Sequence, residues 1–328
     1  MKIQNSITAA LCLFTQIAFA QFAPQVGQTG SDAIYYTNTN FVGWAKAGEL
    51  KRGFQQISDT TLGYASGGAI ESALGKARTN GILSLGDGGQ ATLTFEKPIT
   101  NGDGADFAVF ENGFGGITPQ EAFLELAFVE VSSNGVDFVR FPSISNTQTS
   151  TQTGPFEYLI ALNIYNLAGK YILGYGTPFD LEELKDSSKI NINHITHVRV
   201  IDVVGSINPL MGSKDSKGNM INDPFPTPFP SSGFDLDAIG ILHFEESTGI
   251  NDSEFVSHVY PNPCKLGDFI YVNIENVNSI KLLNLQGNEI FKTENSNQIA
   301  TSNLSSGIYI LQIENNDSVV SQKIVISN

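Results

Sequence analysis

The chain has 328 residues, of which 41% are hydrophobic and 16% are charged, so it is long enough for one large or two smaller domains and too apolar to be largely disordered. Its 33 acidic and 18 basic residues give a formal net charge of −15, which repels phosphate backbones and anionic lipid headgroups and excludes nucleic acid as an expected partner. The 32 Gly and 22 Phe, with a single Trp, favour short strands and Gly-rich turns over a helix bundle.

Residues 1–20 have the pattern of a signal peptide: a charged start, an apolar middle and Ala18-Phe-Ala20 as the cleavage site. We expect the mature chain to begin near Gln21, so that Cys12 is removed and Cys264 is left without a partner for an internal disulfide. No later run reaches the roughly 18 apolar residues that a membrane span needs. The sequence therefore predicts export without a transmembrane segment.

Several segments of the region 21–247 are typical of β-strands. Residues 91–95 alternate apolar residues with threonine, which predicts a strand with one face in solvent. Residues 128–141 hold two strand-like runs on either side of Asn134-Gly135, which predicts a hairpin. Further strands are expected at 107–112, 196–204 and 234–242, and short helices only at 67–77 and 181–185. The predicted fold class is all-β, with a jelly-roll-like β-sandwich at 21–247.

The stretch 248–257 is polar and lacks apolar periodicity, which is typical of a linker. Beyond it, residues 258–328 contain alternating runs at 269–274, 279–285 and 305–313, with turn residues between them. This pattern predicts a second and smaller β-sandwich.

Four motifs of this tail, Tyr260-Pro-Asn-Pro263, Leu283-Asn-Leu-Gln-Gly287, Leu304-Ser-Ser-Gly-Ile-Tyr309 and Lys323-Ile-Val-Ile326, resemble the type A C-terminal sorting domain of the Bacteroidetes type IX secretion system. The resemblance implies an Ig-like fold, the type IX secretion machinery as partner, and a protein that passes through the periplasm to be secreted or held on the outer cell surface. The residues that it implies as the sorting signal are Tyr260, Pro261, Asn262, Pro263, Gly307, Tyr309 and Lys323.

The central region has resemblances of its own. The hairpin Val129–Val139 resembles that of galactose-binding-like, discoidin-type jelly rolls, and His197–Asp202 and Phe234–Gly240 are similar to their late strands. Ser84–Gly89, Gly104–Phe114 and the segments 223–229 and 233–239 resemble an uncharacterised group of bacterial cell-surface proteins, some of whose relatives resemble surface proteins that neighbour corrinoid-uptake genes. These resemblances imply a surface location and a sandwich fold, but no particular activity.

Acidic residues gather where the predicted strands end. Asp235 and Asp237 are two residues apart, so a regular strand places them on one face, with Phe234, Leu236 and Ala238 on the other. Two carboxylates about 7 Å apart repel each other unless water or a cation lies between them. Three roles stay open, which are a calcium site, hydrogen bonds that anchor loops, and simple solvation. The residues concerned are Asp103, Asp106, Glu111, Asp202, Asp235 and Asp237.

Aromatic residues are the second set of binding candidates, because exposed rings stack on sugars and other ligands. Two of them, Phe225 and Phe229, lie in the Pro-rich loop 223–230, which cannot pair in a sheet. The candidates are Trp44, Phe114, Phe225 and Phe229, and the alternative for each is a place in the core.

The common catalytic motifs are absent: the sequence has no G-x-S-x-G, no H-E-x-x-H and no P-loop. We therefore expect a non-enzymatic binding module whose ligand is a glycan or another small molecule. The alternatives are a glycan-active hydrolase that pairs Glu111 or Glu130 with Asp235, a structural or adhesion component of the surface, and a corrinoid-capture protein.

Overall fold

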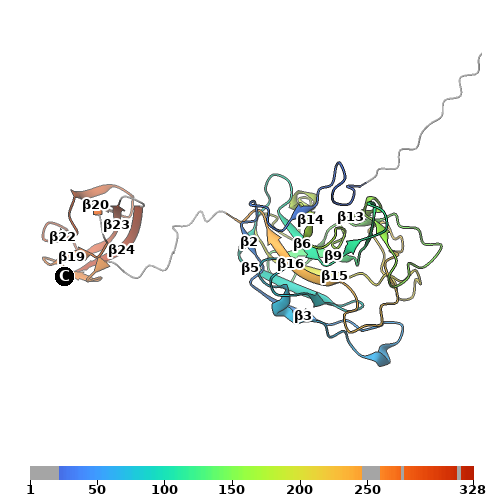
Figure 1. Cartoon of the computed structure of the whole chain (residues 1–328). Helices are drawn as coiled ribbons and strands as arrows, with labels where there is room; N and C mark the ends of the chain where they lie inside the picture. The colour runs from blue at the N-terminus through green and yellow to red at the C-terminus, as the bar shows by residue number, and fades with distance from the viewer. Residues whose placement is uncertain (1–21, 246–258, 275–276, 316–318) are drawn as a thin grey trace, which may run out of the picture. The chain divides into compact units, whose positions relative to one another are not determined.

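The computed structural model describes residues 22–245, 259–274, 277–315 and 319–328. The chain divides into two compact units, Met1–Glu245 and Glu246–Asn328, each of which is described by itself (Figure 1). The predicted signal peptide at 1–20 and the predicted linker at 248–257 lie outside the described residues. Across the described ranges the elements are strands and short 3-10 helices, so the all-β prediction is confirmed.

The larger sheet of the first unit has six strands in the order β1-β14-β6-β16-β2, with β4 also paired to β16. Each pairing is antiparallel. The strands are β1 (Ile34–Tyr35), β2 (Gly43–Trp44), β4 (Leu83–Ser84), β6 (Phe107–Glu111), β14 (Tyr175–Phe179) and β16 (Asp235–Ile241).

The second sheet has five antiparallel strands in the order β10-β9-β15-β5-β3. Its strands are β3 (Ala47–Lys51), β5 (Gln90–Ile99), β9 (Ala127–Ser132), β10 (Val139–Arg140) and β15 (Ile195–Asp202). Two smaller sheets complete the unit: β11 (Ile144–Ser145) with β13 (Ile164–Tyr165), and β12 (Leu159–Ile160) with β8 (Glu121–Phe123) and β7 (Phe114–Gly115).

One hydrophobic core lies between the two large sheets. Val109 and Ile239 reach it from the six-stranded sheet, and Leu93, Val129 and Val200 reach it from the five-stranded sheet. Burial of apolar side chains from both sheets in a single cluster defines a β-sandwich. The sandwich predicted for the central region is therefore confirmed, and Figure 1 shows β6 and β16 of one sheet with β9 and β15 of the other.

The strands predicted in the central region are present. β5 buries Ala91 and Leu93 while its threonines stay partly exposed, and β9 and β10 form the predicted hairpin. The two predicted helices are shorter than expected, because each contains a single 3-10 turn. Residues 22–245 contain four 3-10 helices, which are η1 (Thr60–Leu62), η2 (Ile70–Ala73), η3 (Ala161–Asn163) and η4 (Leu181–Leu184).

One strand departs from the predicted alternation. The register of β16 against β6 shifts between Leu236 and Ala238, which makes Asp237 the extra residue of a β-bulge. Leu236 and Ile239 face the main core, whereas Ala238 packs with Phe110 in a separate cluster. The prediction that Ala238 shares the face of Leu236 is therefore wrong, because a bulge reverses the alternation beyond it.

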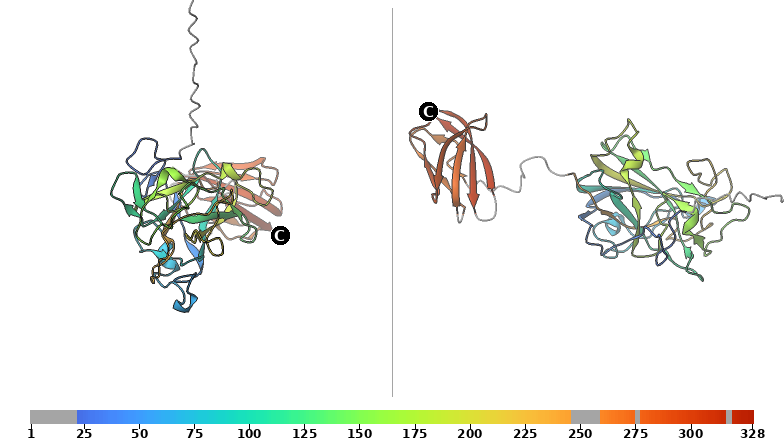
Figure 2. Two further views of the ribbon diagram at one scale, coloured as in Figure 1. Left: turned by 90° about the vertical axis from the view of Figure 1, so that its right-hand side faces the viewer. Right: turned by 90° about the horizontal axis from the view of Figure 1, so that it is seen from above.

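The second unit is a smaller β-sandwich, coloured orange to red in Figure 2. Its core takes Ile270 and Ile299 from a three-stranded sheet, and Leu282, Leu311 and Ile324 from a five-stranded sheet. The first sheet contains β17 (Val259–Tyr260), β19 (Phe269–Val272) and β22 (Gln298–Ala300). The second contains β18 (Cys264–Lys265), β24 (Val319–Ser327), β23 (Gly307–Asn315), β20 (Val277–Leu283) and β21 (Glu289–Glu294).

Candidate functional site

A pocket of about 200 Å³ in the first unit is lined by four phenylalanines and two carboxylates. It combines the residue that follows β6, the β7-β8 hairpin, the segment between β8 and β9, two loops and the start of β16. We call it the aromatic pocket. Its lining is Asn112, Phe114, Phe123, Glu125, Pro155, Phe156, Thr227, Phe229, Ser231 and Asp235.

The four rings form two pairs. Phe114 of β7 and Phe123 of β8 are cross-strand partners, and their rings stack with centroids 4.8 Å apart. Phe156 and Phe229 come from loops that are distant in the sequence, and their rings lie 5.7 Å apart. Phe114, Phe156 and Phe229 are 51%, 66% and 38% exposed, so they are not core residues. Exposed rings around a hollow offer flat apolar faces to a ligand.

Asp235 is fixed at the first position of β16. Its carboxylate accepts a hydrogen bond from the Ser84 hydroxyl on β4 and another, of 2.9 Å, from Nδ2 of Asn112. Burial raises the pKa of Asp235 to about 6, against the two hydrogen bonds and the field of Arg52, which lower it. The guanidinium of Arg52 donates to the carbonyls of Gly67, Gly68 and Ser84, so its hydrogen bonds are made to the backbone.

Glu125 lies in the segment between β8 and β9 and is 7% exposed. Burial raises its pKa well above the ordinary value, and the negative charges of Asp235, Glu111, Asp223 and Asp202 raise it further. The pocket therefore has a carboxyl group at its wall that is surrounded by other carboxyl groups. A ligand with positive charge or hydrogen-bond donors would be favoured there.

Glu111, at the end of β6, is fully buried beside this pocket. Its Oε2 atom accepts a hydrogen bond from the Gly113 amide, whereas Oε1 has no partner in the described part of the chain. Burial is the main reason that its pKa is well above the ordinary value, and Asp235 adds to the effect. Glu111 and Asp235 were both predicted from the sequence, and the structure brings them together.

The other predicted acids are placed elsewhere, and three of them, Asp106, Asp202 and Asp237, are anchored by hydrogen bonds. Asp202 accepts from the amides of Gly88 and Phe234, and burial raises its pKa to about 8. Both oxygens of Asp237 accept from the Arg78 amide. Asp106 accepts from the amides of Gly102 and Leu181 and contacts Nδ1 of His243, and Asp103 is exposed.

These contacts bear on the three roles left open for the acids. Most of the carboxylate oxygens already accept hydrogen bonds from N–H or O–H groups that join separate segments of the first unit. Within the described ranges, no group of three or more His, Cys, Asp or Glu side chains is placed to hold a metal ion. The contacts favour loop anchoring, and the calcium site stays a prediction without support from this geometry.

Of the four predicted aromatic candidates, the structure brings Phe114 and Phe229 to the pocket. Trp44 packs instead against Phe41 and Phe110, with ring centroids 4.9 and 5.6 Å away. Phe225 is 8% exposed and does not line the pocket. These two therefore follow the alternative of structural packing.

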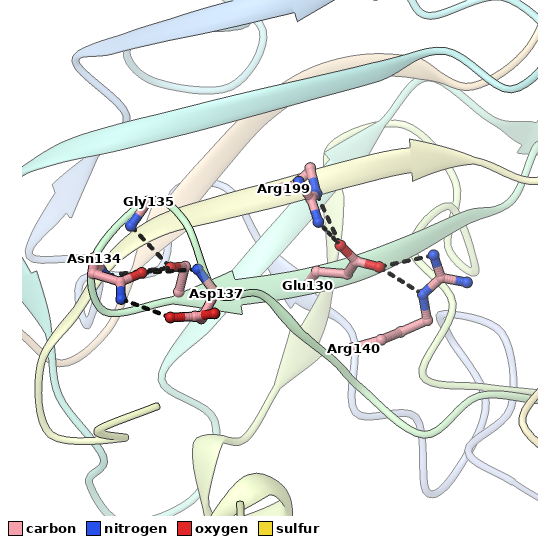
Figure 3. A network of polar contacts seen from close by, with 7 residues as sticks. Glu130, Asn134, Gly135, Asp137, Arg140 and Arg199 are labelled. Carbon is pink, nitrogen blue, oxygen red and sulfur yellow. Dashed lines mark hydrogen bonds and ion pairs between the residues drawn. The ribbon is translucent and has the colours of Figure 1, made fainter. Parts of the chain in front are cut away.

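Glu130, the other glutamate named for a catalytic pair, is part of a cross-strand ion-pair network (Figure 3). It lies opposite Arg140 on β10 and Arg199 on β15. Its Oε1 atom accepts from Nε and Nη2 of Arg140 at 2.9 and 2.8 Å, and its Oε2 atom accepts from both corresponding nitrogens of Arg199. Because it has two guanidinium partners and does not line the aromatic pocket, Glu130 is not available to pair with Asp235 there.

The sequence reasoning missed Glu125, Phe123 and Phe156. One signal existed for Glu125, because it is the single charged residue in the apolar run 122–128. Burial of a carboxyl group is costly, so a buried one indicates a structural or functional role. Phe156 lies in a polar loop and carries no comparable signal.

Two of the predicted sorting-signal residues of the second unit, Asn262 and Lys323, are joined by a hydrogen bond. The side chain of Asn262 donates to the carbonyl of Lys323 and accepts from the amide of Val325, with both bonds 2.9 Å long. Tyr260 is exposed and stacks on Tyr271, and the hydroxyl of Tyr309 donates to the carbonyl of Ser305. Pro261, Pro263 and Gly307 lie in or beside the same strands and turns.

Comparison with known families agrees with the description of the tail. Residues 258–327 match the family described as "Secretion system C-terminal sorting domain". The chain therefore carries a sorting domain that marks it as a substrate of type IX secretion, exported to the cell surface or the medium. No helix of the described residues has the length and apolar character to cross a membrane.

Comparison with whole proteins adds nothing on function. No curated protein matches the chain. Among solved structures, a Faecalibacterium prausnitzii β-glucuronidase is 12% identical with a TM-score of 0.21, over 88% of this chain and 46% of that one. A Ruminococcus gnavus β-glucuronidase in complex with uronic deoxynojirimycin is 13% identical with a TM-score of 0.19, over 88% of this chain and 44% of that one. The BSP domain of a biofilm associated protein is 12% identical with a TM-score of 0.18, over 89% of this chain and 53% of that one. The chain spans about half the length of these structures, and the scores are too low to carry an argument.

Proposed function

We propose that the first unit is a ligand-binding module which the sorting domain delivers to the outside of the cell, and that the aromatic pocket is its binding site for a glycan. The observation that carries this proposal is the combination of Phe114, Phe156 and Phe229, all exposed, with the polar groups of Asn112 and Asp235 in one hollow. Apolar sugar faces stack on rings, while sugar hydroxyls require fixed hydrogen-bonding groups.

The polar groups are held in position before a ligand arrives. The hydrogen bond between Asn112 and Asp235 ties the residue that follows β6 to the first residue of β16, and the Ser84 hydroxyl holds the other oxygen of Asp235. The stacked pair of Phe114 and Phe123 is held by the β7-β8 pairing. Such preorganisation reduces the entropy that a ligand has to lose on binding.

The proposal is tested by binding of the purified protein to a glycan array, followed by calorimetry on each glycan that binds. The F114A and F229A variants should each weaken binding tenfold or more, because a buried aromatic contact is commonly worth 2 kcal/mol or more. L210A is the matched control, since Leu210 is 91% exposed and does not line the pocket. Full binding by both Phe variants would place the ligand elsewhere, and no binding to any glycan would reject the proposal.

A glycan hydrolase is the second candidate, and it rests on one observation. Two carboxyl groups with raised pKa values, Glu125 and Asp235, line the same pocket. Glycosidases use an acid that stays protonated and a second carboxylate that is ionised. Glu125, whose pKa is raised the more strongly by its surroundings, would be the acid and Asp235 the carboxylate.

Release of reducing ends from bound glycans separates the two candidates. A hydrolase would release them, and D235N would abolish this release. Glycans that bind and are recovered intact after long incubation would favour the binding module.

A further inference from the structure

The aromatic pocket has a neighbour that shares one of its rings. A second hollow, of about 600 Å³, is lined by Phe156 and by polar side chains that include Glu121, Glu157 and Tyr158. Phe156 belongs to both linings, with Pro155 on the pocket side and Glu157 on the other. The pocket alone is below the 300 to 1,000 Å³ or so that is usual for ligand sites, whereas the two hollows together lie within that range.

The charge of this combined site has one sign. Glu125 and Asp235 line the pocket, and Glu121 and Glu157 line the second hollow. Of the described residues that line the two hollows, none is Lys, Arg or His. The guanidinium of Arg52 acts on Asp235 through its charge, but its hydrogen bonds are made to backbone carbonyls. The site thus has a net negative field that Arg52 offsets only in part, and a cationic ligand would neutralise this field and favour the ionised form of Glu125.

The rings point to the same kind of ligand. The face of a phenyl ring carries a partial negative charge and attracts ammonium groups, and the attraction grows when the cation is partly removed from water. Phe123 is 8% exposed beside Glu125 in the pocket wall, whereas Phe156 stands open between the hollows. A sugar ring that carries an ammonium group satisfies the ring faces and the carboxylates together, and a sugar acid would be repelled.

From this charge and this arrangement of rings we infer that the site selects glycans with free amino groups, and that the chain of sugars runs from the aromatic pocket past Phe156 into the second hollow. This inference rests on the proposed function, because it names the ligand class of the same site.

A matched pair of ligands tests it: a glucosamine tetramer, with one free amino group per ring that is partly protonated at neutral pH, and the same tetramer fully N-acetylated. Calorimetry with the full chain near neutral pH should show the free amine form binding at least tenfold more tightly, and the difference should shrink with added salt. Equal or tighter binding of the acetylated form would overturn the inference and leave the proposed function standing. If neither tetramer bound while another glycan did, the inference alone would fall; if no glycan bound, both would fall.

Two further arms identify what is recognised. Choline and lysine amide carry a cation without a sugar, and either one binding as tightly as the tetramer would overturn the sugar part of the inference. The variant with E125Q and D235N combined should lose the preference for free amine over acetyl, while E96Q, which removes an exposed carboxylate outside both hollows, should retain it. An unchanged preference in the double variant, with folding verified by circular dichroism, would contradict the assigned role of the two carboxylates.

Discussion

Glu125 and Glu130 are both 7% exposed and lie in the same stretch of chain, yet their surroundings are opposite. Glu130 faces two guanidinium groups, those of Arg140 and Arg199, across neighbouring strands. Glu125 has Asp235 and other carboxyl groups around it and lines a pocket. A buried acid with partners contributes to the fold, whereas a buried acid among like charges costs stability and is a candidate for function.

The largest expected effect comes from removing the charge of the paired glutamate. E130Q turns four charge-assisted hydrogen bonds into weaker ones or breaks them, and it leaves two guanidinium groups without a counter-charge. Because both arginines are partly exposed, we expect a loss of about 3 kcal/mol in the free energy of unfolding, below the upper values for fully buried pairs.

Calorimetry that follows the transition of the first unit would measure this loss as a fall in Tm of roughly 6 to 12 °C. E96Q is the control, because Glu96 is exposed, and it should leave the Tm unchanged. A Tm for E130Q within 2 °C or so of the parent protein would show that the network is worth no more than an ordinary surface pair.

The next effect is a dependence of stability on pH. Burial raises the pKa of Asp87 and Asp235 to about 6 and that of Asp202 to about 8, whereas in an unfolded chain each is about 3.9. The folded chain therefore holds these protons more tightly than the unfolded chain. The stabilisation that these protonated carboxyl groups give to the folded chain is fully present below about pH 4, and it is lost as the pH rises through 6 and then 8.

Between pH 5 and pH 8 we thus expect the Tm of the first unit to fall. The free energy of unfolding should decrease by up to about 1.4 kcal/mol per pH unit for each proton that is released on unfolding. D235N should flatten the part of the curve near pH 6, since an amide can keep one hydrogen bond from Asn112 and has no charge to bury. A Tm that rises over this range would mean that these carboxyl groups are ionised in the folded chain with compensating partners.

The contrast between Glu125 and Glu130 could be predicted only in part from the sequence. Asn134-Gly135 indicates the hairpin, and the hairpin places Arg140 opposite Glu130. The side chain of Asn134 accepts from the amide of Val136 and from that of Asp137, the residue labelled beside it in Figure 3. Local signals of this kind act over a few residues, which is why they can be read directly.

The aromatic pocket was less predictable, because it depends on distances between segments far apart in the chain. Phe156 and Phe229 meet although 72 residues separate them, and no periodicity records that contact. The bulge at Asp237 could not be predicted from the sequence either, since neither a Gly nor a Pro marks it. The sequence supplied the list of candidates, and tertiary packing placed Phe114, Phe229 and Asp235 at the pocket and Glu111 beside it.

A smaller effect, and one of opposite sign, is expected for the unpaired glutamate. E125Q removes a carboxyl group whose pKa is raised by burial and by neighbouring acids, and it keeps nearly the same shape. Because the raised pKa makes the parent protein lose stability as the pH rises, whereas an amide does not titrate, the Tm of the variant relative to the parent protein should increase from pH 5 to pH 8. Destabilisation at both pH values would show that Glu125 makes a structural contact comparable to that of Glu130.

The smallest effect is expected from calcium. A bound ion would need several oxygen ligands at once, but the oxygens of Asp202 and Asp237 already accept hydrogen bonds from backbone amides, which an ion would have to displace. Specific binding to the folded chain must raise its stability by mass action. We expect millimolar calcium to shift the Tm of the first unit by less than about 1 °C, and a chelator to leave it unchanged. A rise with calcium that a chelator reverses would instead establish the calcium site, and the acids of the first unit would then act through the ion rather than through their amide partners.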